Sequence, residues 1–329
     1  MGIAVSYHDK AGKLQEFDRF ASGPFDRSEW FALLAGHLER PLLVIGNDMR
    51  RQVALALMET DEGLQSLANW FSFTWRPLGR KDQITDEVLA GIAADLRGRS
   101  HSVVLSPMPD EDGSTSRTAA AFRKAGWAVF VEQCDENHVL PVDGRNFSTY
   151  WSYRPGAMRT TLLRKGKKVE TEIHSQFDEA AWQDYRRVYE GSWKPEEERA
   201  EMLEAFARAE GEAGRVRIGI ARAGGEPVAT QFWTVENGTA YIHKLAHLEE
   251  AKPLSAGTTL SAAMFAHAMD RDGVDLIDFG TGSDAYKRDW MEFVRQRYRV
   301  TCLDWRQPRA WKPLAKAILR RLASKSPRG

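Results

Sequence analysis

The sequence predicts an α/β (α+β) protein with two similar domains, mixed and mainly antiparallel central sheets, and a C-terminal amphipathic helix. The chain has 329 residues, 43% of them hydrophobic, which is enough for two ordinary domains with a core each. Two stretches repeat one order of strands, turns and a helix, and the end of the chain is basic. We place the domains at residues 1–145 and 146–305 and the basic tail at residues 306–329.

The first repeat lies in the N-terminal third of the chain. Apolar runs mark its strands, Gly-Asn-Asp and Asp-Glu-Gly sequences mark turns, and apolar residues at helical spacing mark its helices. The predicted elements, in chain order, are strands at 42–45, 53–58 and 70–75, a helix at 86–96, a strand at 102–105, a helix at 118–125 and a strand at 127–131.

The strand predicted at residues 70–75 carries aromatic side chains on both faces, among them Trp70 and Trp75. Burial between helices would explain this pattern by packing alone. A large or apolar substrate is the other explanation, and under it Trp75 contacts the substrate.

The second repeat has clearer signals. Asn237-Gly238 between two alternating segments is a strong hairpin signal, because both residue types tolerate the positive φ angles of the turn. The predicted elements, in chain order, are strands at 215–223, 228–235 and 239–247, a helix at 257–270 and a strand at 274–279.

Ionisable residues gather at the end of the last of these strands. Asp278 lies in the strand, two glycines allow the backbone to turn after it, and Tyr286 and Lys287 open a short helix at 286–290. An acid, a phenol and an ammonium at one strand end indicate an active site.

A basic helix rich in aromatic residues is predicted between the domains, at residues 147–168. Arg154 and Arg159 belong to it, and such a helix can hold an anionic phosphate or nucleotide group. A solvated helix face with its aromatics docked on the core explains the same pattern.

The composition limits the possible partners and cofactors. Lys+Arg and Asp+Glu both number 46, so the net charge gives no indication of a nucleic-acid partner. Cys134 and Cys302 have no ligand spacing, so we expect neither a disulfide framework nor a metal site. The chain has no apolar run long enough to span a membrane and no export signal, so we expect a cytoplasmic protein.

The order of strand, Asn-Gly hairpin, strand, loop, helix, strand and tyrosine-bearing helix resembles the GNAT acyltransferase fold. Asp278-Phe279-Gly280, Gly282, Tyr286-Lys287 and Trp290, after an arginine-rich helix, are more similar to the CelD/BcsL-type acetyltransferases. These enzymes are related to Fem-type aminoacyltransferases and have two GNAT-like domains in one chain. The resemblance covers residues 154–290 by motif and the first domain by pattern only. It implies an acyl-CoA-dependent N-acyltransferase with two tandem GNAT-like domains.

The family also implies where acyl-CoA binds. Its pantetheine lies along the strand that corresponds to residues 239–247, and its pyrophosphate lies at the start of the next helix, where N–H groups favour an anion. The residues that the resemblance assigns to acyl-CoA are Lys244, Leu245, Ala246, Lys252, Ser255, Ala256, Gly257 and Thr258. This loop departs from the glycine-rich Q/RxxGxG/A pattern of the family, and Fem-type relatives use aminoacyl-tRNA instead.

Catalytic roles follow from the same resemblance. Tyr286 stands where GNAT enzymes carry the acid that protonates the leaving thiolate. Lys287 can stabilise the oxyanion or bind a phosphate, Asp278 can orient or deprotonate the acceptor, and His243 is a second candidate base. Structural explanations exist as well: Asp278 caps the turn after its strand, and His243 is a half-buried, hydrogen-bonded histidine. Trp193, at a helix end, lines the acceptor cleft or packs locally.

The basic tail has the form of an interfacial helix over residues 311–325. Trp311 and Ile318 lie on its apolar side, and Lys312 and Arg320 lie on the other. Such a helix binds anionic lipid on the inner face of a membrane, or else docks on its own domain. Membrane binding would favour a lipid acceptor such as a sphingoid base, as in bacterial ceramide synthases. A sugar of an envelope polysaccharide is the other acceptor that the family suggests.

Three functions remain open at this point. The first is an acyl-CoA-dependent N-acyltransferase. The second is an aminoacyl-tRNA-dependent Fem-type transferase, which would bind tRNA through Arg154 and Arg159. The third is a non-catalytic GNAT-like binding module, against which the ordered Asp278, Tyr286 and Lys287 argue. The first domain has no counterpart of Tyr286-Lys287, so we expect it only to shape the acceptor cleft.

Overall fold

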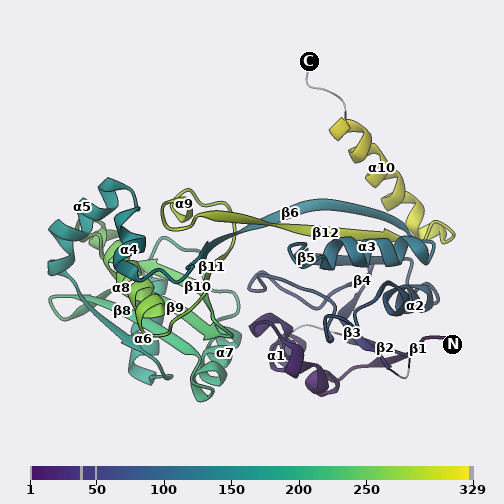
Figure 1. Ribbon diagram of the computed structural model, residues 1–329, viewed down its shortest axis with the longest axis horizontal. Helices are drawn as coiled ribbons and strands as arrows, with labels where there is room; N and C mark the ends of the chain where they lie inside the picture. The colour runs from purple at the N-terminus through teal and green to yellow at the C-terminus, as the bar shows by residue number, and fades with distance from the viewer. Residues whose placement is uncertain (1, 38–39, 49, 326–329) are drawn as a thin grey trace. The chain divides into compact units, whose positions relative to one another are not determined.

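The computed structural model describes residues 2–37, 40–48 and 50–325, and they form two compact units. Unit 1 comprises residues 1–135 and 295–329, and unit 2 comprises residues 136–294 (Figure 1). These boundaries differ from the predicted 145 and 305, because the last strand of the chain pairs inside unit 1. Residues 326–329 of the predicted tail lie outside the described residues.

Unit 1 contains a mixed sheet in the order β1-β2-β3-β4-β5-β12. All neighbouring strands are antiparallel except β4 and β5, which are parallel. Its strands are β1 (Ala4–His8), β2 (Pro41–Asn47), β3 (Gln52–Thr60), β4 (Gly63–Ser66), β5 (Ser102–Met108) and β12 (Phe293–Leu303). Its helices are η1 (Ala11–Phe20), η2 (Pro24–Asp26), α1 (Ser28–His37), α2 (Asp86–Leu96), α3 (Ser114–Lys124), η5 (Pro308–Ala310) and α10 (Trp311–Lys325).

Unit 2 repeats this order with β7-β8-β9-β10-β11-β6, and its one parallel pair, β10 and β11, lies at the same place. Its strands are β7 (Glu170–His174), β8 (Val216–Ala223), β9 (Glu226–Glu236), β10 (Thr239–His247), β11 (Leu276–Thr281) and the second part of β6 (Ala128–Pro141). Its helices are α4 (Phe147–Ser152), α5 (Gly156–Lys165), η3 (Gly166–Lys168), α6 (Glu179–Glu190), α7 (Ala200–Glu212), η4 (Glu249–Leu254), α8 (Ala256–Asp270) and α9 (Lys287–Trp290). The predicted tandem arrangement of two similar α/β domains is confirmed.

Helices cover both faces of the sheet in unit 2 (Figure 1). Trp233 and Phe232 are consecutive in β9 and therefore point to opposite faces. The Trp233 ring packs edge-on against Phe265 of α8 at 5.4 Å, and the Phe232 ring packs edge-on against Trp182 of α6 at 5.6 Å. The α8 side and the α6 side are thus two separate apolar layers on one sheet.

The strand predicted at residues 70–75 is wrong. These residues form a loop after β4, and Trp75 is buried with its indole N–H donating to the Ala56 carbonyl at 2.8 Å. Phe73 packs against Phe25 at 4.8 Å. The aromatic side chains fill the core of unit 1 from an irregular segment. Their alternation therefore reflects burial in a loop and not a β-strand.

The predicted helix at 147–168 is also interrupted. Pro155 separates α4 from α5, because proline disfavours helical geometry in the residue before it. Tyr150 of α4 is buried and donates to the Trp290 carbonyl at 2.7 Å, whereas α5 has no buried residue. Tyr150 of the aromatic part therefore belongs to the core, whereas the residues of α5 are partly or fully exposed.

Candidate active site

The parallel pair in unit 2 opens after a short stretch of pairing. β10 and β11 are in register only at Thr239 with Leu276, Ala240 with Ile277, and Tyr241 with Asp278, although β10 continues to His247. The register between β10 and β9 shifts between Ile242 and Lys244, which marks a bulge. A bulge bends its strand and increases the local twist. The register between β10 and β11 thus ends at Tyr241, whereas β10 stays in register with β9 up to His247, except at the bulged His243.

The start of α8 lies close to the end of this open strand. A Cβ atom placed on Gly257 would lie 3.3 Å from Nδ1 of His247. Ser255 adopts a left-handed conformation before the helix, and its hydroxyl accepts a hydrogen bond from Lys165 at 3.2 Å. The predicted donor residues Ala256, Gly257 and Thr258 form the first turn of α8, and no acidic residue lies in that turn. A helix start of this kind favours an anion.

Lys252 lies in the turn before α8 and contacts a carboxylate. It is exposed and pairs with Glu249 at 2.6 Å. Leu245 and Ala246 belong to β10, where Leu245 packs against the apolar layer on the α8 side and Ala246 is buried. The structure thus brings the predicted donor residues together along the end of β10 and the start of α8.

Asp278 is buried at the last register position shared by β10 and β11. Its carboxylate accepts the Gly280 N–H at 2.8 Å and the side-chain amide of Asn137 at 3.3 Å. Gly280 has a φ of 67°, a conformation that glycine adopts without strain. This geometry agrees with the structural explanation, in which Asp278 fixes the turn after its strand.

Tyr286 and Lys287 follow this turn and have different environments. Tyr286 is 37% exposed, and its ring packs edge-on against Phe279 at 5.7 Å. Burial and the nearby Asp284 carboxylate raise the pKa of Tyr286, so the phenol keeps its proton at neutral pH. Lys287 is buried, and its ammonium donates to the carbonyls of Thr281 and Gly282. Tyr286 is thus partly open to solvent, whereas Lys287 holds the loop before it.

His243 faces the α6 side of the sheet, among aromatic rings. Its ring stacks on Phe232 at 5.0 Å, and Nε2 lies 2.7 Å from the Thr234 hydroxyl. Burial, followed by the neighbouring Lys244 charge, lowers the pKa of His243 to about 3. The imidazole is neutral at physiological pH and is a poor proton acceptor, which agrees with a packed, hydrogen-bonded histidine.

Lys244 also faces the α6 side, because the bulge brings two consecutive side chains of β10 to one face. Its ammonium pairs with Glu197 at 2.6 Å, and both side chains are buried. It also lies 5.4 Å from the centre of the Tyr189 ring. Burial lowers the pKa of Lys244 to about 8, and the Glu197 carboxylate acts in the opposite direction. A lysine with this pKa exchanges protons near neutral pH.

The predicted acceptor-binding residues do not form one cluster. Trp193 is 45% exposed and its ring lies 4.3 Å from the His247 ring, so it flanks the end of β10. Arg154 is largely buried and pairs with Glu292 at 2.6 Å, which suits a structural role. Arg159 is exposed and donates to the Arg154 carbonyl. Trp75, in the core of unit 1, cannot contact a substrate without unfolding its surroundings.

Asn137 and Glu197 take part in the site and were not predicted from the sequence. Asn137 lies in β6 and is fully buried, and Glu197 lies between α6 and α7. Both are polar residues in segments without a motif. Only the pairing of β6 with β11 and the path of the α6–α7 loop bring them to Asp278 and Lys244.

Among the described residues, no group of three or more His, Cys, Asp or Glu side chains is arranged to hold a metal ion. Within the same part of the chain, no helix is long and apolar enough to cross a membrane.

Comparisons with known proteins agree with the repeated fold. Residues 156–288 match the family described as acetyltransferase (GNAT) domain. A comparison with curated proteins gives no match. Among solved structures, FemX has a TM-score of 0.66 at 8% identity, over 97% of this chain and 100% of that one. The C-terminal domain of a putative lysylphosphatidylglycerol synthetase from Agrobacterium fabrum has a TM-score of 0.61 at 11% identity, over 98% of each chain.

A tandem GNAT protein from the clavulanic acid biosynthesis pathway also resembles the chain, with a TM-score of 0.51 at 12% identity over 91% of this chain and 98% of that one. These identities establish the fold alone. Residues 156–288 are therefore similar to GNAT-type acetyltransferase domains, and the fold of the chain is similar to those of FemX and of the lysylphosphatidylglycerol synthetase domain.

Proposed function

We propose that unit 2 is an N-acyltransferase that takes an acyl group from acyl-CoA and transfers it to a primary amine. The observation that carries the proposal is the opening between β10 and β11, with the start of α8 near its end. The backbone of residues 242–247 offers N–H and carbonyl groups to an extended pantetheine arm, and the α8 start favours its pyrophosphate.

A protonated amine loses two protons in this reaction, one before it attacks and one from the tetrahedral intermediate. The leaving thiolate takes up one proton, so one proton is released overall. The amine nitrogen attacks the thioester carbon, the carbonyl oxygen becomes an oxyanion, and the C–S bond then breaks. Neutral Lys244 is our candidate for accepting the ammonium proton, because its pKa of about 8 suits that task better than the pKa of His243. Tyr286, protonated and partly exposed, donates a proton to the leaving sulfur.

The role of Lys244 can be tested through the pH profile. The rate constant kcat/KM should rise with pH and level off above about pH 8, because the amine must be neutral. Glu197→Gln should move this limb to lower pH, since the Glu197 carboxylate raises the pKa of Lys244. A profile that does not change in Glu197→Gln would exclude Lys244 as the base.

Donor binding is the first experiment for the whole proposal. Titration calorimetry with acetyl-CoA and palmitoyl-CoA should show binding of at least one donor. Tighter binding of palmitoyl-CoA would favour a lipid acceptor such as a sphingoid base, as in ceramide synthases, and equal binding would favour a sugar amine of an envelope polysaccharide, as in CelD/BcsL-type enzymes. Absence of binding to either donor would refute the proposal.

A donor other than CoA is the second candidate. The likeness to FemX and to the lysylphosphatidylglycerol synthetase domain spans nearly the whole chain, and the turn before α8 lacks the glycine-rich pattern. An aminoacyl-tRNA donor predicts binding that falls steeply with salt and depends on exposed basic residues such as Arg159. A filter-binding titration with aminoacyl-tRNA at two salt concentrations separates the two donors.

We further propose that α10 binds an anionic membrane surface, which would place a cytoplasmic enzyme on the inner face of the membrane. Trp311 is 60% exposed, Ile318 45% and Leu319 66%, so these three apolar side chains of the helix are not buried against unit 1. Lys312, Lys316 and Arg320 are exposed on the same helix. Exposed apolar side chains together with basic ones suit an interfacial helix.

Vesicle sedimentation tests this second proposal. The protein should sediment with phosphatidylglycerol vesicles and not with phosphatidylcholine vesicles, and 0.5 M salt should weaken the binding. Leu319→Ser and Lys316→Glu should each reduce sedimentation, whereas Lys124→Glu on α3 is the matched control. Equal sedimentation with both lipids would contradict a charge-based contact.

A further inference from the structure

The segment formed by α5 and η3 in unit 2, residues 156–168, carries a concentrated positive charge. We call it the basic segment, because it contains five basic residues and no acidic one. Four of its cations are exposed, and one is partly buried. The five basic residues are Arg159, Arg164, Lys165, Lys167 and Lys168.

No carboxylate in the described part of the chain forms an ion pair with these five cations. Arg159 donates to the Arg154 carbonyl at 3.1 Å, and Lys165 donates to the Ser255 hydroxyl at 3.2 Å. Both acceptors are neutral groups, so they do not compensate the charge. The basic segment therefore presents its positive charge to the surroundings of the protein.

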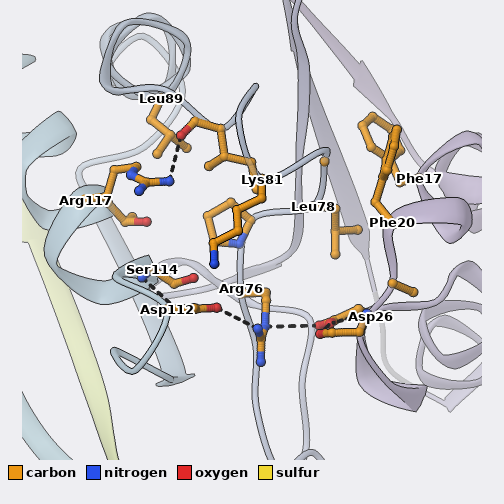
Figure 2. A pocket seen from close by; sticks show the side chains of 16 residues that line it. Phe17, Phe20, Asp26, Arg76, Leu78, Lys81, Leu89, Asp112, Ser114 and Arg117 are labelled. Carbon is orange, nitrogen blue, oxygen red and sulfur yellow. Dashed lines mark hydrogen bonds and ion pairs between the residues drawn. The ribbon is translucent and has the colours of Figure 1, made fainter. Parts of the chain in front are cut away.

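Arginines in other parts of the molecule have carboxylate partners. In the pocket of unit 1, Arg76 contacts Asp112 at 2.6 Å and Asp26 at 3.5 Å, and Figure 2 shows these three residues in a row. In unit 2, Arg145 pairs with Glu292 at 2.9 Å. The uncompensated charge of the basic segment thus differs from these paired sites and favours a partner with many negative charges.

The exposed side of α5 also carries an apolar side chain. Met158 and Leu162 pack against the apolar layer on the α8 side of the sheet. Leu163 lies on the exposed side of the helix, one turn after Arg159 and next to Arg164. It is 79% exposed. An exposed leucine between two arginines suits a partner that has an apolar layer beneath a negatively charged surface.

From the uncompensated charge and the exposed leucine, we propose that the basic segment binds the surface of an anionic lipid bilayer. The cations contact the lipid phosphates, and the Leu163 side chain enters the apolar layer. A nucleic-acid backbone would match the charges but gives Leu163 no apolar partner. This contact belongs to unit 2 and is separate from the contact proposed for α10 of unit 1.

A bilayer on the basic segment also has a consequence for the acceptor. Lys165 contacts Ser255, which directly precedes α8, the helix at whose start we place the donor pyrophosphate. A bilayer bound there would keep the candidate site near the membrane surface and favour a membrane-held amine as acceptor. This consequence rests on the proposed function, whereas the lipid contact does not, and the experiment below contains no acyl donor.

A fluorescent label at residue 163 tests the contact directly. In the full chain with Cys134→Ser, NBD is attached to Leu163→Cys, and the remaining cysteine, Cys302, is buried. Emission should rise about twofold or more with phosphatidylglycerol vesicles and not with phosphatidylcholine vesicles, and doxyl lipids should quench it. Ala213→Cys is the matched control, because it is exposed at the end of α7, on the α6 side of the sheet, and its label should not respond.

Unlabelled variants separate the charge from the apolar contact. Vesicle sedimentation is measured in a Leu319→Ser background, which weakens the contact proposed for α10. Leu163→Ser should then weaken phosphatidylglycerol binding about tenfold, and Lys168→Gln about fivefold. Lys124→Gln removes a charge from α3 of unit 1 and should have no effect. Tm should stay unchanged in all three variants, because the three side chains are exposed.

Four outcomes would overturn the proposal. They are no response of the label at 163 to vesicles, equal responses at 163 and 213, undiminished binding of Leu163→Ser, and equal effects of Lys168→Gln and Lys124→Gln. A label at 163 that responds to unacylated tRNA and not to vesicles would assign the basic segment to a nucleic acid instead.

Discussion

The two units share one strand order but differ at the fourth strand, which is β4 in unit 1 and β10 in unit 2. In unit 2, β10 has nine residues, carries a bulge and leaves β11 after three register positions. In unit 1, β4 has four residues and is in register with β5 at two positions. The segment after β4 folds back as an aromatic loop and fills the core.

The helices that follow these strands differ as well. α2 begins with Asp86 and Glu87, whereas the first turn of α8 has no acidic residue. An anion is repelled at the first helix start and favoured at the second. The features on which we base the proposed acyl-donor site are thus present in unit 2 and differ in unit 1. The following predictions test that difference.

The largest effect is expected for Tyr286→Phe, since unit 1 has no counterpart of this residue. The turnover number kcat should fall by roughly 10²- to 10⁴-fold, because the leaving thiolate loses its proton donor. Donor affinity and Tm should stay near the wild-type values, as Tyr286 is partly exposed. Undiminished turnover would mean that the two units differ in something other than this acid.

Trp75→Ala tests whether the aromatic loop of unit 1 belongs to the core. It should lower the free energy of unfolding by about 3 to 5 kcal/mol, because a fully buried indole and its hydrogen bond to Ala56 are lost. Chemical denaturation followed by tryptophan fluorescence measures this. A stable variant with a raised KM for the acceptor would instead restore the substrate-binding hypothesis.

His243→Asn tests the packing of β10 through its pH dependence. The folded-state pKa is about 3 and the unfolded one about 6.5, so the unfolded chain binds the extra proton between these values. The stability contribution of the neutral imidazole is present above pH 6.5 and is lost as the pH falls toward 3. The change is up to about 5 kcal/mol. Unfolding free energies should depend less steeply on pH in the variant, and an identical slope would contradict the buried assignment.

The smallest effect is expected at the α8 start. Gly257→Asp should weaken acyl-CoA binding about tenfold, because the new carboxylate would repel the pyrophosphate that we propose to lie at this helix start. The fold should be retained, since an acid is tolerated in a first helical turn. Asp86→Asn at the start of α2 is the control and should leave donor binding unchanged. Equal responses in calorimetry would remove the distinction between the two helix starts.

Sequence patterns predicted the second repeat more accurately than the first. The strand at 239–247 in the second repeat has its predicted bounds, because alternation is a local signal. In the first repeat the helix at 86–96 has its predicted bounds as well. β4 was missed, since four residues give little periodicity and the aromatic run beside it is a stronger pattern. Pro155 is a helix-breaking residue, and the prediction of one continuous basic helix at 147–168 did not take it into account.

Only those residues of the candidate site that belong to a local sequence motif could be predicted. Tyr286 and the start of α8 were found from local sequence and family resemblance. The pairing of Lys244 with Glu197, and of Asp278 with Asn137, depends on residues far apart in the chain, and no local pattern specifies such contacts. Burial also decides the chemistry of His243, because its ring is packed against Phe206 of α7 and Phe232 of β9.

The last strand of the chain gives unit 1 an unusual order of assembly. β12 pairs with β5 through Tyr298 with Met108 and four further positions, yet it is synthesised after all of unit 2. During translation β5 therefore lacks its partner β12 until residue 303 has left the ribosome. One edge of β5 stays unpaired until then. The segment that forms unit 2 ends at residue 294, so it is synthesised in full before the strand that completes the sheet of unit 1.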